Sequence, residues 1–203
     1  MMMDRAKNLK HKRSMQALKK QVDGTVARAT RDQGLCLLLT GDGKGKTSSG
    51  FGMLMRSLAY GKAVGIVQFI KGKQPSGEEN YIRQRHPEIP FYQMGTGFTW
   101  DTQDREADIS AARQTWSAAE KLLKDESIEF LLLDELTYML SLKYLEEQQV
   151  LDAIRNRPAG QHVVITGRGG GKALKDLADT VSEIRNIKHA YEAGVKAQEG
   201  VDY

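Results

Sequence analysis

From residue 34 onward, short apolar runs alternate with segments in which apolar residues recur every three or four positions. We expect the apolar runs to form buried strands at 35–39, 63–69, 89–94, 128–133 and 162–166. Pro90 makes the third of these the weakest, because proline cannot donate to a strand ladder. Helical spacing is clear at Phe51, Leu54, Met55 and Leu58, with Gly61 as the expected stop, and a longer helix begins near Asp104. Continuous apolar strands separated by helices predict a mostly parallel sheet covered on both faces, the α/β class.

Length and composition limit the kind of protein that this can be. A chain of 203 residues with 40% hydrophobic residues can bury one core, so a single domain with a small extension is expected. No apolar run approaches the roughly 20 residues of a membrane-spanning helix, and the N-terminus lacks the apolar stretch of a secretory signal. The lone Cys36 excludes an internal disulfide framework. These features favour a soluble, cytoplasmic protein without a membrane partner.

Charge is concentrated at the N-terminus. Residues 1–31 hold nine Lys or Arg and two acids, a net charge of +7, so the rest of the chain carries −3 of the total of +4. Such a basic arm can bind nucleic acid, an anionic membrane surface or a polyanionic small molecule, or it can be a solvated, partly disordered tail. Met15, Leu18 and Val22 recur at helical spacing, which suggests that part of the arm folds against something apolar.

The strongest chemical signal lies between the first predicted strand and the first predicted helix. The residues there are Gly41, Asp42, Gly43, Lys44, Gly45, Lys46, Thr47 and Ser48. Glycines allow successive backbone N–H groups to point at phosphate oxygens, the lysine adds a positive charge, and the threonine hydroxyl can bind Mg²⁺. The usual phosphate-loop pattern has glycine where this chain has Thr40, so the loop's entry is modified. The alternative is an ordinary glycine-rich turn.

A second signal supports the first. The apolar run 130–133 ends in Asp134 and Glu135, and in phosphate-loop proteins a carboxylate at such a strand end holds or positions Mg²⁺. The alternative is that these acids merely cap the strand end or the helix after it. Together, the two signals predict a site for a Mg²⁺–nucleoside triphosphate, in which either acid could also activate a water molecule for hydrolysis.

Six segments in one order resemble the P-loop family of ATP:corrinoid adenosyltransferases. They are 40–47, 67–72, 95–100, 133–138, 164–169 and 188–198, and the resemblance covers residues 34–203. This family also has threonine before its first loop glycine. Asp42 differs from the asparagine more often found there, which affects a local hydrogen bond.

The resemblance implies a RecA-like fold and a reaction that needs no general base. Co(I) of cobalamin, or of a precursor corrinoid, attacks the ribose C5′ of ATP and inorganic triphosphate leaves, in the synthesis or salvage of adenosylcobalamin. ATP would lie reversed relative to other P-loop enzymes. Lys46 would stabilise the triphosphate, Thr47 and Glu135 would bind Mg²⁺ (or Mn²⁺), and Arg56 and Arg168 would contact phosphates.

Further expectations come from the same resemblance. Phe98 and Trp100 would form an apolar surface below cobalt that keeps Co(II) four-coordinate and so eases its reduction, although they could equally be core aromatics. The electron would come from a reduced flavodoxin-type protein. A homodimer is expected, with residues 1–31 as an arm or lid and 32–203 as the nucleotide- and corrinoid-binding domain.

Two other classes stay open from the residues alone. One is a P-loop ATPase or kinase whose basic arm binds nucleic acid or a small molecule, although the resemblance favours no nucleic-acid partner. The other is a nucleotide-gated binding module without turnover. Product analysis separates the transferase, which releases triphosphate, from the ATPase or kinase, which releases ADP and phosphate. A change in corrinoid absorption on mixing with ATP and reductant would exclude the binding module.

Overall fold

The computed structural model describes residues 2–70, 75–95 and 104–203, and for residues 2–6 the backbone alone. The chain divides into two compact units, Met1–Asp32 and Gln33–Tyr203. The first is helix α1 (Met2–Arg28), on which Met15, Leu18 and Val22 are about half exposed, so their predicted helical spacing is confirmed. No helix in the described part of the chain is long and apolar enough to cross a membrane.

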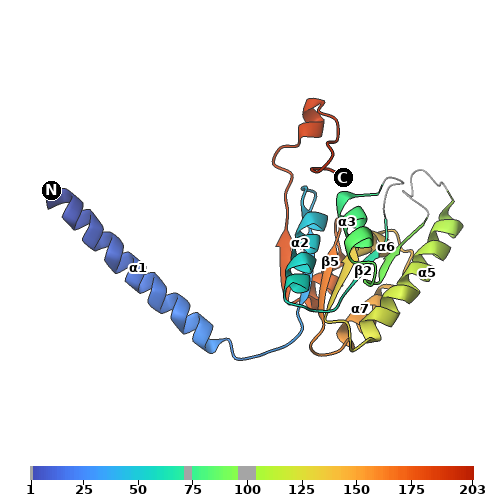
Figure 1. Cartoon of the computed structure of the whole chain (residues 1–203), viewed down its shortest axis with the longest axis horizontal. Coiled ribbons are helices and arrows are strands. Elements are labelled where there is room, and N and C mark those ends of the chain that lie inside the picture. The colour runs from blue at the N-terminus through green and yellow to red at the C-terminus, as the bar shows by residue number, and fades with distance from the viewer. Residues whose placement is uncertain (1, 71–74, 96–103) are drawn as a thin grey trace. The chain divides into compact units, whose positions relative to one another are not determined.

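The second unit is built on a six-stranded sheet (Figure 1). The strands lie in the order β3-β2-β4-β5-β1-β6, and every neighbouring pair is parallel. Their bounds are Cys36–Thr40 (β1), Val64–Gln68 (β2), Phe91–Gln93 (β3), Phe130–Asp134 (β4), His162–Thr166 (β5) and Thr180–Glu183 (β6). The five strands expected from the sequence are confirmed, the third shortened to three residues at the edge of the sheet. The sixth strand was not predicted, because its residues are all exposed and carry no apolar pattern.

Helices cover both faces of this sheet. On one face lie α2 (Lys46–Ala59) and α3 (Gly77–Arg85). On the other lie α5 (Arg105–Lys124), α6 (Leu136–Ser141), α7 (Glu147–Arg155) and α8 (Gly171–Leu177). A short 3₁₀ helix, η1 (Ala190–Ala193), follows near the C-terminus. Helix α5 begins where expected, because the Asp104 side chain accepts a hydrogen bond from Ala107 N at 3.1 Å and caps it.

Alternation along the strands sorts the core into two clusters. In β4, Leu131 and Leu133 pack with the α5 to α8 face, whereas Phe130 and Leu132 pack with the α2 and α3 face. Successive strand residues point to opposite faces, so a strand buried on both sides must be apolar throughout. This explains the continuous apolar runs. It also predicts that a side chain an even number of residues after Phe130 and Leu132, such as that of Asp134 at the strand's carboxyl end, points toward α2 and α3.

Candidate functional site

The glycine-rich loop joins β1 to α2 at the carboxyl edge of the sheet. It is packed against the segment that follows β6: Gly43 N donates to Ile184 O at 2.8 Å. A Cβ atom on Gly41 would lie 2.3 Å from Ile184 O, and one on Gly43 would lie 2.6 Å from the backbone of Arg185. Gly41 also has a φ of 103°, in the left-handed region that favours glycine. Backbone packing alone therefore requires both glycines.

Thr40, the departure from the usual loop pattern, has a structural role. Its side chain is buried, and its hydroxyl donates to Gly169 O at 2.7 Å. This bond ties the start of the phosphate loop to the loop after β5, a contact that glycine could not make.

Lys46 begins α2 and is 8% exposed. Its ammonium donates to Gly43 O at 2.7 Å, so it folds back over the loop. Burial lowers the pKa of Lys46 below its usual range, and the nearby Glu135 carboxylate opposes this shift. An ammonium held with so little water in a loop of backbone N–H groups is well placed to bind an anion.

Thr47 is held by Asp134 rather than by Glu135. The Thr47 hydroxyl donates to Asp134 Oδ1 at 2.9 Å, and Thr166 Oγ1 donates to the same oxygen at 2.5 Å. The other carboxylate oxygen of Asp134 accepts from Gln68 Nε2 at 2.9 Å. With its proton committed to Asp134, the Thr47 oxygen keeps its lone pairs for a cation, as a Mg²⁺ ligand in a phosphate loop requires.

Glu135 lies one residue further along and lines the cavity beside the loop. Its backbone is left-handed at a φ of 59°, uncommon for a residue other than glycine, and its N–H donates to Thr166 Oγ1 at 3.0 Å. Such backbone conformations persist where the surroundings enforce them, frequently at functional sites. Thr166 thus anchors both acids at the end of β4.

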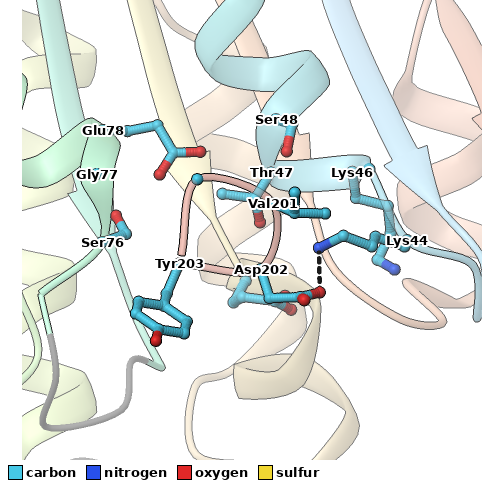
Figure 2. Close-up of a pocket in the computed structure, with 13 residues that line it drawn as sticks. Lys44, Lys46, Thr47, Ser48, Ser76, Gly77, Glu78, Val201, Asp202 and Tyr203 are labelled. Carbon is cyan, nitrogen blue, oxygen red and sulfur yellow. Dashed lines mark ion pairs between the residues drawn. The ribbon is translucent and has the colours of Figure 1, made fainter. Parts of the chain in front are cut away.

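A cavity of about 450 Å³ lies between the phosphate loop, the start of α3 and the C-terminal residues (Figure 2). Lys44, Lys46, Thr47 and Ser48 line the loop side. The C-terminal segment 200–203 forms another wall, and there Lys44 Nζ and Asp202 Oδ1 form an ion pair at 2.9 Å. The loop after β1 and the C-terminal residues therefore meet at this cavity.

A second cavity of about 380 Å³ adjoins the loop and contains Arg168 together with Asp42. The Asp42 carboxylate accepts from Asn186 N at 3.0 Å, and this bond, followed by one from its own backbone, holds the pKa of Asp42 below its usual value. His189 and Tyr191, from the C-terminal region, line the same cavity. Arg168 and the phosphate loop thus lie around one space.

The structure brings most of the predicted site residues together and leaves others apart. Residues 42–48, Glu135 and Arg168 border one or both of these cavities, and Gly41 borders a third one beside Arg168. Arg56 is exposed in the last turn of α2, about 15 Å along the helix from Lys46 at 1.5 Å per residue, and borders neither cavity. Phe98 and Trp100 lie outside the described residues.

Sequence reasoning did not single out Gln68, Gln93 or Thr166, and it did not identify Asp134 as the acid that holds Thr47. Each of the three lies at the carboxyl end of a strand, on the face of the sheet that α2 and α3 cover. A polar residue that ends an otherwise apolar run was the available signal, and Gln68 also lies in one of the segments that carried the family resemblance.

Comparisons with known proteins identify the family of this chain. A family model described as "ATP:corrinoid adenosyltransferase BtuR/CobO/CobP" matches residues 32–203. The corrinoid adenosyltransferase of Escherichia coli K12 is 48% identical over 96% of this chain and 98% of its own. The corresponding proteins of Salmonella typhimurium and Pseudomonas aeruginosa are 47% and 46% identical, over 96% and 97% of this chain and 98% and 97% of their own. The chain belongs to the ATP:corrinoid adenosyltransferase family.

Proposed function

We propose that the cavity beside the phosphate loop binds ATP and presents its ribose to the cobalt of a reduced corrinoid, so that the protein transfers the 5′-deoxyadenosyl group and releases triphosphate. The observation that carries this proposal is the phosphate loop itself, in which the Lys46 ammonium donates to Gly43 O and the Thr47 hydroxyl donates to Asp134, beside a cavity of about 450 Å³, in a chain of this family. The ATPase or kinase alternative shares the loop but is not favoured by the family.

The residues present fit a Mg²⁺ ion that is completed by phosphate oxygens. Mg²⁺ prefers oxygen ligands and usually takes one or two protein groups together with substrate phosphates. The Thr47 hydroxyl and the Glu135 carboxylate offer such oxygens, and Asp134 orients Thr47 from below. Among the described residues no group of three or more His, Cys, Asp or Glu could hold a metal alone, which suits a site that forms with the nucleotide. When bound, the ion adds positive charge to the triphosphate.

The step itself is a nucleophilic displacement. The electron pair of Co(I) forms a bond to C5′ while the C5′–O5′ bond breaks, and that bond's electrons leave on the triphosphate. Co(I) carries its own electron pair, so the protein needs no base, and its task is to align the two substrates and to stabilise the leaving group. Lys46 and the loop N–H groups meet the triphosphate, while Arg168 and Lys44 add charge around the same loop.

The corrinoid side of the site rests on the family resemblance. We propose that Phe98 and Trp100 exclude the lower axial ligand from cobalt, and that a reduced flavodoxin-type protein delivers the electron. We also propose a cytoplasmic homodimer in which the basic arm, residues 1–31, closes over the substrates held by residues 32–203. The arm's charge and the half-exposed Met15, Leu18 and Val22 support this role.

Product analysis tests the proposal. The protein is incubated without oxygen with ATP, Mg²⁺, cob(II)alamin and a reductant strong enough to form Co(I). We expect a light-sensitive alkylcobalamin spectrum and one triphosphate per adenosyl group, and neither product without reductant. Release of ADP and phosphate without a corrinoid product would instead identify an ATPase or kinase.

A further inference from the structure

A row of polar side chains crosses the carboxyl end of the sheet beneath the phosphate loop. The strand register pairs Gln93 of β3 with Gln68 of β2, and Gln68 with Asp134 of β4. Thr166 ends β5, one step beyond the pairing of Leu133 with Ile165. Each of these residues lies two positions after a strand residue that packs against α2 and α3, so its side chain points to the same face of the sheet. The row therefore lies on the same face as Thr47 in α2 and Glu79 in α3.

Hydrogen bonds connect this row from end to end. Asp134 accepts from Thr47, Thr166 and Gln68. The other end of the Gln68 amide, Oε1, lies 3.5 Å from Gln93 Nε2, which also donates to Glu79 Oε2 at 3.1 Å. Every side-chain donor in this hydrogen-bond network points toward a carboxylate or toward the neighbouring glutamine amide. Replacement of either glutamine would therefore interrupt the network.

Burial makes these bonds matter. Gln68 and Thr166 are fully buried, Asp134 is 1% exposed and Glu79 is 6% exposed. A buried carboxylate that loses a donor cannot recover it from bulk water, so it turns or shifts to find another. Because Thr47 donates to the Asp134 oxygen next to the one that Gln68 holds, a turn of Asp134 moves the Thr47 hydroxyl.

Glu79 extends the connection to the opposite wall of the cavity. Its N–H donates to the Ser76 hydroxyl at 3.3 Å, which caps α3, and Arg83 Nε donates to its carboxylate at 2.9 Å. Ser76, Gly77 and Glu78 line the cavity of about 450 Å³ on the side opposite the phosphate loop. The polar chain therefore joins the two walls between which a nucleotide would lie.

We propose that Gln68 and Gln93 are positioning residues for the metal–nucleotide site. Gln68 fixes the orientation of Asp134 and thereby of the Thr47 hydroxyl. Gln93 connects Gln68 to Glu79 and so to the start of α3. The inference rests on the Mg²⁺–nucleotide part of the proposed function and not on the corrinoid chemistry. Groups that contact a metal ligand from behind, as Asp134 contacts Thr47, typically change metal affinity by about 10–100-fold when they are removed. Gln68 contacts Asp134 and not Thr47, so its loss should act at the lower end of this range, about tenfold.

The first test measures metal binding without turnover. Mn²⁺ replaces Mg²⁺, and its binding in the presence of the β,γ-imido analogue of ATP is followed by electron paramagnetic resonance, without corrinoid. We expect Gln68→Leu to weaken Mn²⁺ binding by about tenfold. The matched control is Gln161→Leu, which removes another buried amide, one that donates to Leu122 O and Ile128 O. It should lower stability and leave Mn²⁺ affinity within about twofold.

The second test follows α3 and uses a milder substitution. Gln93 is partly exposed on the edge strand, so Gln93→Leu should fold even if Gln68→Leu does not. In the wild-type protein, binding of Mn²⁺ and the analogue should slow amide exchange in residues 77–82. In Gln93→Leu the complex should still form, and the slowing should be largely lost.

The outcomes separate this inference from the proposed function. Unchanged Mn²⁺ affinity in Gln68→Leu, or unchanged slowing of exchange in Gln93→Leu, overturns the positioning role even if adenosyl transfer is demonstrated. Conversely, a protein that releases ADP and makes no alkylcobalamin refutes the proposed function, whereas the Mn²⁺ and exchange results keep their meaning. Equal weakening in Gln161→Leu would show a general effect of losing a buried amide and would also overturn the inference.

Discussion

Replacement of Lys46 by alanine removes a buried positive charge that faces the phosphate loop. The ammonium is 8% exposed and donates to Gly43 O, so water cannot take its place easily when triphosphate leaves. Loss of one preorganised contact to a developing charge costs roughly 10²–10³-fold in rate, about 2.7–4 kcal/mol. We expect Lys46→Ala to lose adenosyl transfer by at least this factor at saturating Mg²⁺–ATP.

Lys44→Ala is the matched control, because it removes the same charge from the same loop. Lys44 is 41% exposed and paired with Asp202, and exposed ion pairs contribute about 0.2–1 kcal/mol. Its loss should therefore slow transfer less than about fivefold. Lys46→Ala should also fold at least as stably as the wild type without nucleotide, because burial already lowers the pKa of Lys46 and so disfavours its charged form.

The assay uses chemically preformed cob(I)alamin, so that reduction does not limit the rate, and follows alkylcobalamin formation in a single turnover. Thermal unfolding of each variant is measured in parallel. A Lys46→Ala rate within about fivefold of the wild type would refute the assigned role. Equal losses in the two variants would show that net charge near the loop matters, rather than the buried position of Lys46.

Three other outcomes can be measured on the same protein. Residues 1–24 should exchange their amides rapidly alone and slowly with ATP and corrinoid bound, and equal exchange in both states would exclude a lid. Phe98→Ala and Trp100→Ala should lower the four-coordinate fraction of Co(II) corrinoid, seen by electron paramagnetic resonance, and slow transfer with a flavodoxin-type donor more than with preformed Co(I); an unchanged fraction would mark them as core aromatics. Burial raises the pKa of Cys36 from 9.0 to about 11, so this thiol contributes stability below pH 9 that is lost as the pH rises toward 11. Cys36→Ala should flatten that part of the unfolding free-energy profile, and an unchanged slope would show that other groups cause it.

The sequence alone determined the fold class, the phosphate loop and the family, because each depends on residues close together in the chain. The apolar runs that became β1, β2, β4 and β5 are buried on both faces, so their composition alone marks them. Strand β6 and the helices α3, α6, α7 and α8 were not predicted; β6 buries none of its residues and α3 buries few. Local pattern cannot indicate an element whose stability comes from its neighbours.

Tertiary structure decided which residues surround the loop. The sequence placed Asp134 and Glu135 at one strand end but could not say which of them would hold Thr47, because the two point in different directions from a backbone that turns at Glu135. Strand register, which depends on pairing between distant segments, aligned Gln93, Gln68 and Asp134. The path of the chain after β6 brought the C-terminal Asp202 to Lys44. These contacts join residues far apart in the chain, so their free energy is gained only when the whole sheet has formed, and no local pattern records it.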